Sequence, residues 1–377
     1  MTSQTNPQML LYRARLLLEE GRADDALSAL ASVHTEDEKQ QQEIAYLLGW
    51  CHIQKKQWSE AVQVLASLLQ MKPEGEIDTL LERERLVLSL LHLGEAATNL
   101  GHYEDAALHF TACLKVLHDR RVHMPSVRIK ARYSLATTCI RRGLYSAAIR
   151  NYDEALRLCR HYNSDEELAD IYHGLCSACR YVGDFARAMT SGQQALVLYR
   201  QKAQRDMEAR VQNLMGEISF LLGDYREASD HYTESMAIAT SFNGPTLAML
   251  NCVALANVRV AEGRLDEARR YCQFALETME LSHNTEMSGT VYHAVGNVTY
   301  EEAKQAQGDE RKKLLEDAVS LYKKASEQLN PTQAYAEKAE VFGRWANALE
   351  ELGREQEAID LWRSGYVVLT QKAEEAR

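Results

Sequence analysis

Three asparagines in the C-terminal part of the chain stand in equivalent surroundings and could bind a ligand. Asn257, Asn297 and Asn347 each follow a small residue in a segment whose apolar residues have helical spacing. A short amide side chain supplies one acceptor and two donors, so it can pair with a peptide backbone through two hydrogen bonds. The row therefore predicts a site for an extended ligand. The alternative is that each amide is solvated or bonded to a neighbouring helix.

A mixed set of polar, cationic and aromatic residues occupies related positions in these and earlier segments. The set consists of Asn213, Lys130, Tyr133, Thr137, Arg141, His173, Ser177, Arg180, Arg210, Glu217, Phe220, His293, Tyr300 and Arg344. Its cations are concentrated in the middle of the chain, where a planar guanidinium could bind a ligand carboxylate or an acidic side chain. The aromatic rings could form apolar side pockets. The competing interpretation pairs the arginines with nearby glutamates in surface salt bridges.

Metal binding and catalysis find little support in the residue pattern. His173, Cys176 and Cys179 lie three residues apart on one predicted helix, a pattern that could suggest zinc. Ligands at these intervals drift around the helix axis and no fourth ligand is indicated, so we expect the cysteines to act as small packing residues. The chain has no phosphate-binding glycine loop, nucleophile elbow or His-Glu-x-x-His motif. We therefore predict no metal, no cofactor and no enzymatic activity.

The helices that must position these residues are indicated by alanines that recur about every 40 residues. The alanines are Ala26, Ala61, Ala106, Ala148, Ala188, Ala228, Ala268, Ala318 and Ala358. In seven cases a glycine lies five residues earlier, at Gly21, Gly101, Gly143, Gly183, Gly223, Gly263 and Gly353. A fixed period of this length is typical of a solenoid of stacked repeats, which creates a long concave binding surface.

Each repeat is predicted to contain two antiparallel helices joined by a short turn. In the sixth repeat, residues 207–222 have apolar side chains at helical spacing, and residues 225–241 form a second such segment. Between them, Gly223 tolerates the left-handed end of the first helix and Asp224 can cap the second. A small residue such as Ala228 lets the two helices approach closely, and aromatic residues of the second helix fill the space between repeats.

Several segments depart from the regular pattern. The eighth repeat has about ten extra residues around 304–313, which we expect to form a longer first helix and a charged loop. Residues 71–78 are expected to be a linker, and the sparse first repeat is expected to cap the array. The prolines are expected to lie between repeats, at Pro73, Pro125, Pro245 and Pro331.

Composition limits the partner classes and the compartment. The net charge of −11 disfavours nonspecific nucleic-acid binding, which requires a basic face. The eight cysteines lie within helical patterns, so reduced thiols are expected. No N-terminal stretch resembles a signal peptide and no run of 18 residues is apolar. These features predict a cytoplasmic protein that does not bind membranes.

The repeat pattern resembles the tetratricopeptide repeat (TPR) from about residue 8 to residue 370. The resemblance rests on Leu93-Gly94…Gly101-His102-Tyr103…Ala106 and on Met215-Gly216…Gly223-Asp224-Tyr225…Ala228. The usual period is 34 residues, and the longer period here is similar to that of bacterial Rap-type quorum-sensing regulators and of sensor domains in helix-turn-helix regulators. The resemblance implies that the first helix of each repeat lines the concave groove, where asparagine at the position of Asn257 commonly binds peptide backbone.

We therefore expect an all-α, right-handed superhelical solenoid of about nine antiparallel helix pairs. Residues 1–377 would form a single TPR-like solenoid, with capping repeats at 1–70, the main array at 79–370 and a tail at 371–377. The expected function is non-catalytic binding of an extended peptide or protein segment in signalling or regulation.

Two alternatives remain open. The chain could be a constitutive scaffold that assembles a complex, or the sensor part of a transcription regulator whose DNA-binding domain is elsewhere. Direct nucleic-acid binding by this chain is not expected, and formation of a homodimer stays open.

Overall fold

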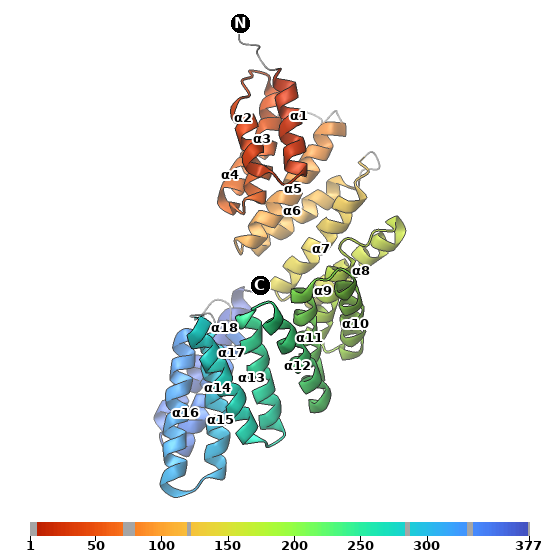
Figure 1. The fold of residues 1–377 in the computed structure, drawn as a ribbon. Helices are drawn as coiled ribbons and strands as arrows, with labels where there is room; N and C mark the ends of the chain where they lie inside the picture. Colours follow the sequence, from red (N-terminus) through yellow and green to blue (C-terminus); the bar gives the residue numbers. More distant parts are fainter. Residues whose placement is uncertain (1–5, 71–79, 119–121, 283–286, 330–334, 376–377) are drawn as a thin grey trace. The chain divides into compact units, whose positions relative to one another are not determined.

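The computed structural model describes the backbone of residues 6–70, 80–118, 122–282, 287–329 and 335–375. Side chains are described over the same ranges except residues 70, 80–81, 335–336 and 371–375. Throughout these ranges the regular structure consists of α-helices without a strand (Figure 1). The predicted all-α class is therefore confirmed.

The helices follow one another along the chain with short connections, as expected for stacked helix pairs. Those of the described residues are α1 (Pro7–Glu19), α2 (Ala23–Ala31), α3 (Glu38–Gln54), α4 (Trp58–Gln70), α5 (Leu80–Asn99), α6 (Tyr103–Val116), α7 (Pro125–Arg141), α8 (Tyr145–Tyr162), α9 (Leu168–Tyr181), α10 (Phe185–Gln201), α11 (Arg205–Leu221), α12 (Tyr225–Ser241), α13 (Pro245–Ala261), α14 (Leu265–Ser282), α15 (Ser288–Gln305), α16 (Gly308–Gln328), α17 (Tyr335–Glu351) and α18 (Glu355–Glu375). Odd-numbered helices are the first helices of the predicted repeats, and even-numbered helices are the second.

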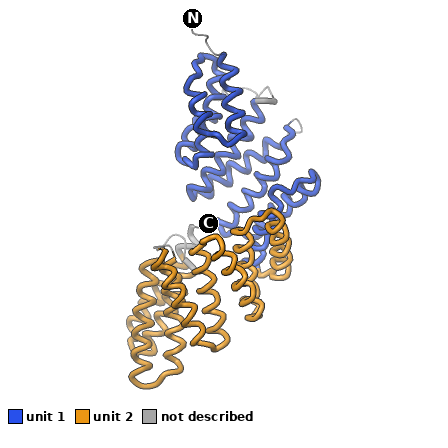
Figure 2. The backbone as a smooth tube through the Cα atoms, in the orientation of Figure 1, with its two compact units in different colours: residues 1–182 blue, residues 183–377 orange. Residues whose placement is uncertain are grey.

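The chain divides into two compact units. Unit 1 comprises residues 1–182 with α1 to α9, and unit 2 comprises residues 183–377 with α10 to α18 (Figure 2). The fifth predicted repeat, α9 and α10, is divided between the units. The organisation of residues 1–377 as a single solenoid with a capping region at 1–70 stays a prediction.

The recurring alanines lie where two helices of a repeat pack most closely. All nine are completely buried: Ala26, Ala61, Ala106, Ala148, Ala188, Ala228, Ala268, Ala318 and Ala358. Each lies in the first turns of a second helix, except Ala318, which lies in the middle of α16. A larger side chain at such a contact would force the helices apart, so the sequence period reflects the packing of each helix pair.

The turns between paired helices confirm the predicted role of glycine. The seven turn glycines have φ values between 72° and 81°, a left-handed conformation that is unfavourable for residues with a Cβ atom. The second repeat has Lys56 at this position, with a φ of 57°. After the turn at Gly223, the Asp224 carboxylate accepts a hydrogen bond from the Glu227 N–H at 3.0 Å, which confirms its predicted capping role.

Glycines inside the first helices make room for large rings of the second helices. A Cβ atom on Gly216 would lie 2.7 Å from the Tyr232 ring, and one on Gly296 would lie 2.9 Å from the Tyr322 ring. Tyr232 and Tyr322 are buried. The glycine and the ring are thus complementary parts of one contact between the paired helices.

The extra residues of the eighth repeat form only part of the structure that we expected. The first helix α15 ends at Gln305, nine residues after Gly296, whereas α13 ends five residues after Ala256, so some of the added residues lengthen the first helix. The others lengthen the second helix α16, which begins at Gly308. Asp309 and Glu310 lie in its first turn, where acidic side chains stabilise a helix N-terminus. The predicted lengthening of the first helix is therefore found at the C-terminal end of α15, whereas the predicted charged loop is wrong because residues 308–313 belong to α16.

The remaining irregular segments are only partly described. Pro125 and Pro245 begin α7 and α13, as expected for proline between repeats. Pro73, Pro331 and the predicted linker at 71–78 lie outside the described residues. The predicted tail at 371–377 has no described side chains, and α18 reaches Glu375.

The cysteines are packing residues of the helices. All eight are free and buried. Burial raises the pKa of the Cys51 thiol to about 11 and that of the Cys113 thiol to about 12. Among the described helices, none combines the length and the apolar character that crossing a membrane requires.

Candidate ligand-binding face

First helices of neighbouring repeats form a continuous face within unit 2. Helix α11 contacts α13, α13 contacts α15 and α15 contacts α17, whereas the described second helices α12, α14 and α16 make no contact with one another. Helices that pack closer together lie on the inner side of a curved stack. Asn257 on α13, Asn297 on α15 and Asn347 on α17 therefore lie on the helices of the inner side.

The three asparagines differ in how their amides are engaged. Asn257 and Asn347 are half-buried, and neither has a hydrogen-bond partner among the described residues. The Asn297 Oδ1 accepts a hydrogen bond of 3.0 Å from the Tyr322 hydroxyl, and its Nδ2 lies 3.2 Å from the His293 Nε2. Two amides of the row are thus free to bind a ligand, and the middle amide is bonded to its own repeat.

Asn213 belongs to a buried polar network that ties three helices together. Its Nδ2 donates to the Asn251 Oδ1 at 3.0 Å, and Asn251 donates to the Ser235 Oγ and the Leu247 carbonyl, both at 2.8 Å. Ser235 in turn donates to the Ala209 carbonyl at 2.7 Å. Because an unsatisfied buried amide would be unfavourable, this network holds α11, α12 and α13 in register.

Unit 2 carries acidic as well as basic groups near the row. Arg344 lies 3.9 Å from the Glu301 carboxylate, whereas Arg210 is exposed. The buried Tyr300 donates its hydroxyl to Glu351 at 2.6 Å, and Lys304 lies 4.5 Å from the Tyr300 ring centre. The predicted residues Tyr300 and Arg344 are thus engaged within unit 2.

The environment of Glu351 keeps this carboxylate ionised. Burial raises its pKa, but hydrogen bonds from Tyr300 and Arg311 outweigh that effect and leave the pKa below its ordinary value. The Arg311 hydrogen bond, from α16 to α17, measures 2.8 Å. The N-terminal extension of α16 thereby contributes a cation, Arg311, that holds α17, which is the first helix of the last repeat.

Unit 1 holds the predicted residues of the fourth and fifth repeats. Lys130 on α7 forms an ion pair with Glu95 on α5 at 2.7 Å. The Tyr133 ring lies 6.2 Å from the Tyr152 ring, and burial raises the pKa of Tyr133. On α9, Arg180 lies 4.1 Å over the ring of Tyr181. The structure thus pairs the cation Lys130 with a glutamate of the neighbouring first helix.

The contact between Asn297 and Tyr322 in unit 2 has a counterpart in unit 1. Thr137 occupies in α7 the register of the asparagine row, and its hydroxyl lies 3.0 Å from the Tyr152 hydroxyl. Tyr152 corresponds in register to Tyr322, the partner of Asn297. In these two repeats the polar residue at this register therefore contacts the tyrosine of its own second helix.

The motif His173, Cys176 and Cys179 does not gather metal ligands. Cys176 and Cys179 are completely buried in the packing of α9, and His173 is half-buried. Among the described residues there is no group of three or more histidine, cysteine or acidic side chains that could hold a metal ion.

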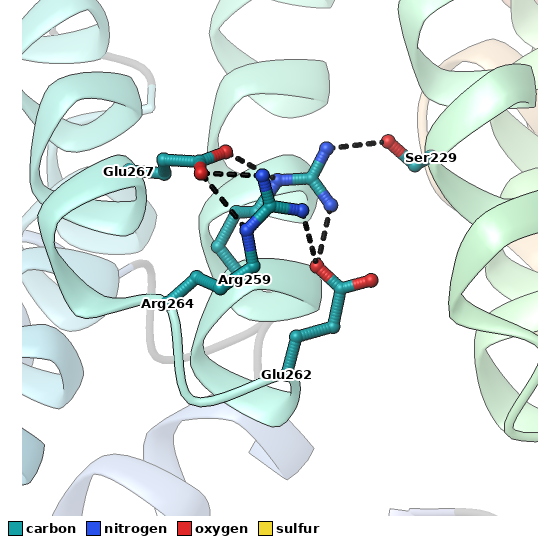
Figure 3. A network of polar contacts seen from close by, with 5 residues as sticks. All are labelled: Ser229, Arg259, Glu262, Arg264 and Glu267. Carbon is teal, nitrogen blue, oxygen red and sulfur yellow. Dashed lines mark hydrogen bonds and ion pairs between the residues drawn. The ribbon is translucent and has the colours of Figure 1, made fainter.

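A polar clamp holds the helix that carries Asn257. The Arg259 guanidinium donates to the Ser229 Oγ of α12 at 2.8 Å and pairs with Glu262 at 2.6 Å and with Glu267 of α14 at 3.2 Å (Figure 3). Arg264 contacts the same two glutamates from the turn (Figure 3). Because Arg259 is only 12% exposed, its hydrogen bond to Ser229 of α12 and its ion pair with Glu267 of α14 hold α13 against both second helices.

The N-terminal half of unit 1 contains an aromatic cluster that sequence reasoning missed. The rings of Tyr46, Trp50 and His92 lie 6.0 to 6.2 Å apart, and the rings of Tyr46 and His92 are parallel. Beside them, the Glu43 carboxylate bridges Arg15 at 3.3 Å and Arg85 at 3.4 Å. Trp50 and Arg15 occupy the register of the asparagine row in the first two repeats, which could have identified the cluster.

A separate cavity lies on the side of the second helices. It has a volume of about 370 Å³ and lies between α12, α13 and α14. Its lining consists of Met236, Cys252, Glu267, Arg270, Tyr271 and Phe274. None of the predicted site residues lines this cavity.

Comparison with known proteins agrees with the helix-pair architecture. Residues 17–84 match the tetratricopeptide repeat family. No curated protein sequence matches the chain at a significant level.

Solved structures resemble the chain over nearly its full length. The apo form of RapI has a TM-score of 0.73 at 12% identity and covers 98% of this chain and 99% of its own. The apo form of the quorum sensor NprR from B. thuringiensis has a TM-score of 0.68 at 15% identity and covers 96% and 98%. A Rap protein complexed with Competence and Sporulation Factor has a TM-score of 0.60 at 15% identity and covers 98% and 99%.

These findings define the fold of the protein. The chain has a TPR-like fold of helix pairs, and the predicted resemblance to Rap-type sensors is confirmed for the fold. At identities of 12 to 15%, similarity to these structures supports the fold alone. The ligand and the activity must therefore be argued from this chain's own residues.

Proposed function

We propose that the protein is a non-catalytic regulatory module that binds an extended peptide or protein segment along the inner helices of unit 2. Asn257 and Asn347 would pair with the backbone of the bound segment. The observation that carries this proposal is that both amides share one register on the inner helices and have no partner among the described residues.

A free amide in a half-buried position favours binding over a structural role. An amide that only stabilised the fold would be expected to find a partner, as Asn297 and Asn213 do. A peptide backbone has unpaired N–H and C=O groups along its whole length, so a row of amides can hold it without selecting its side chains. Selectivity would come from neighbouring groups such as the exposed Arg210 and the pair of Arg344 with Glu301.

The structural comparison supports the same class of ligand. One of the similar structures is a Rap protein in complex with Competence and Sporulation Factor, and another is a quorum sensor. By extension, we propose a cytoplasmic signalling role for this chain, with a peptide or protein partner and without direct contact to nucleic acid or membrane.

The proposal is tested by removing the two free amides. A pool of random heptapeptides is passed over the immobilised protein, and the retained peptides are identified by mass spectrometry. The affinity of a retained peptide is then measured by fluorescence anisotropy for the protein and for Asn257→Ala and Asn347→Ala. Each variant is expected to bind about tenfold more weakly, since two lost hydrogen bonds are worth about 1.4 kcal/mol after exchange with water.

Gln273→Ala is the matched control. Gln273 is an exposed amide on the second helix α14 of the same unit, where it donates to Glu277 at 2.9 Å. Its removal should leave peptide affinity unchanged. Full affinity in the double variant Asn257→Ala/Asn347→Ala, with an unchanged circular dichroism spectrum, would show that the inner helices are not the binding face.

A further inference from the structure

The first and the last helix expose apolar side chains that the described residues leave uncovered. On α1, Met9 and Tyr12 are each 64% exposed, and Leu16 is 41% exposed. On α18, Trp362 is 46% exposed and Tyr366 is 70% exposed, and Val367 and Leu369 of the same helix are exposed as well. The end repeats of a solenoid usually present polar outer faces, so exposed apolar side chains at both ends are unusual.

The exposed residues of α1 occupy the register that each internal first helix uses to pack on the preceding repeat. Relative to the repeat period, Met9, Tyr12 and Leu16 correspond in α15 to Val291, Ala294 and Val298. In α15 these three residues are buried in one cluster with Cys272 and Ala275 of α14, the second helix of the preceding repeat.

The exposed residues of α18 occupy the opposite half of the same junction. Trp362 and Leu369 correspond in register to Tyr322 and Leu329 of the preceding repeat. Tyr322 and Leu329 are buried in one cluster with Val341 and Ala348 of the following helix α17. At α18 the equivalent positions have no following helix over them among the described residues.

We propose that the α18 face of one copy of this protein packs against the α1 face of a second copy. The contact repeats between chains the junction that α14 makes with α15 and that α16 makes with α17. Such an interface is head-to-tail, so the assembly retains one free α1 face at one end and one free α18 face at the other unless it closes into a ring. This proposal is independent of peptide binding.

A second copy is the occupant that the internal packing favours. The two end faces are complementary halves of one junction, and a second copy supplies whichever half the first lacks. Pairing of two α18 faces would place second helix against second helix, a contact that α12, α14 and α16 do not make with one another. Aromatic residues such as Tyr12, Trp362 and Tyr366 are also the type enriched in protein interfaces.

Two matched variants test the proposal, each changing one exposed tyrosine. Tyr12→Glu places a charge on the α1 face, and Tyr366→Glu places one on the α18 face. Sedimentation velocity of the 377-residue chain over a range of micromolar concentrations is expected to show self-association. Each variant alone is expected to be monomeric, and an equimolar mixture of the two is expected to form a 1:1 dimer through the remaining intact faces.

The possible outcomes separate the modes of association. If Tyr12→Glu still forms dimers alone while Tyr366→Glu does not, the α18 faces pair with each other and the head-to-tail proposal is wrong. A wild-type chain that stays monomeric throughout also overturns it. Leu108→Glu, which changes a 68% exposed residue of α6 away from both ends, should associate like the wild type. Thermal melts followed by circular dichroism confirm that each variant is folded.

Discussion

At the scale of a single residue, burial rather than neighbouring charge sets the pKa of His92. His92 lies beside the rings of Tyr46 and Trp50, and burial lowers its pKa to about 4, against the raising effect of Glu95. The histidine therefore remains neutral at physiological pH and acts as a third aromatic ring of the cluster.

This histidine should make the protein sensitive to mild acid. Because its pKa is lower in the folded chain than in the unfolded chain, the unfolded chain binds the proton first as the pH falls. The stability that neutral His92 contributes is complete above about pH 6.5 and is lost progressively toward about pH 4. At pH 5 the loss in the free energy of unfolding amounts to about 2 kcal/mol. Urea unfolding at pH 7.5 and at pH 5, followed by tryptophan fluorescence, should show a smaller pH effect in His92→Phe than in the wild type.

The control for this measurement is His102→Phe, which changes an exposed histidine of the same repeat. It should retain the pH dependence of the wild type. An equal loss of stability at pH 5 in His92→Phe and in the wild type would mean that other groups cause the acid sensitivity.

The sequence predicted which residues share a register, but it did not predict what each one binds. Asn257 and Asn347 are free, whereas Asn297 is bonded to Tyr322, which lies beyond the added residues of the eighth repeat. Asn213 is engaged by Asn251, a buried residue that the sequence did not distinguish from an ordinary helix position. Such partners depend on side chains that meet only after the repeats have stacked.

At the scale of elements, the turn between paired helices was predictable because it depends on a single backbone conformation. A glycine five residues before a buried alanine identified seven turns. The extension of α16 was not predictable in the same way, because both a loop and a longer helix satisfy the charged sequence there. The choice is fixed by contacts such as that of Arg311 with Glu351.

The turn that lacks glycine offers a direct test of this account. Lys56 is exposed and has a φ of 57°, a conformation that costs a residue with a Cβ atom about 1 kcal/mol or more. Lys56→Gly should therefore stabilise unit 1 by about 0.5–1 kcal/mol, after the greater freedom of glycine in the unfolded chain is deducted. The measurement is the midpoint of urea denaturation.

Gly101→Ala is the reverse experiment in the next repeat. Gly101 has a φ of 81°, and a Cβ atom there would meet nothing within 4 Å, so any loss of stability comes from the backbone. It should destabilise the protein by about 1 kcal/mol. Destabilisation by Lys56→Gly would show that the lysine side chain contributes an interaction that outweighs the backbone strain.

On the scale of the whole molecule, stability should be distributed repeat by repeat. Each helix of a solenoid packs mainly on its neighbours, so a local defect should weaken nearby repeats more than distant ones. A Cβ atom on Gly94 would lie 2.7 Å from the Phe110 Cδ1 atom in unit 1, and one on Gly216 would lie at the same distance from Tyr232 in unit 2.

Hydrogen exchange followed by mass spectrometry can map how far each defect spreads. Gly94→Ala should speed exchange in α5, α6 and α7 through overpacking worth about 1–3 kcal/mol, and leave α15 to α18 unchanged. Gly216→Ala should act in the same way on α11 to α13 and leave α1 to α4 unchanged. Equal acceleration along the entire chain in either variant would show that the two units unfold as one cooperative body.

The buried cysteines give the molecule a further property. Because all eight thiols are buried, a reagent that modifies sulfur must wait until the surrounding helices separate. The thiols are spread over five of the predicted repeats, from Cys51 in α3 to Cys272 in α14. The order in which a thiol reagent labels the native cysteines would therefore record which helices of the chain separate first.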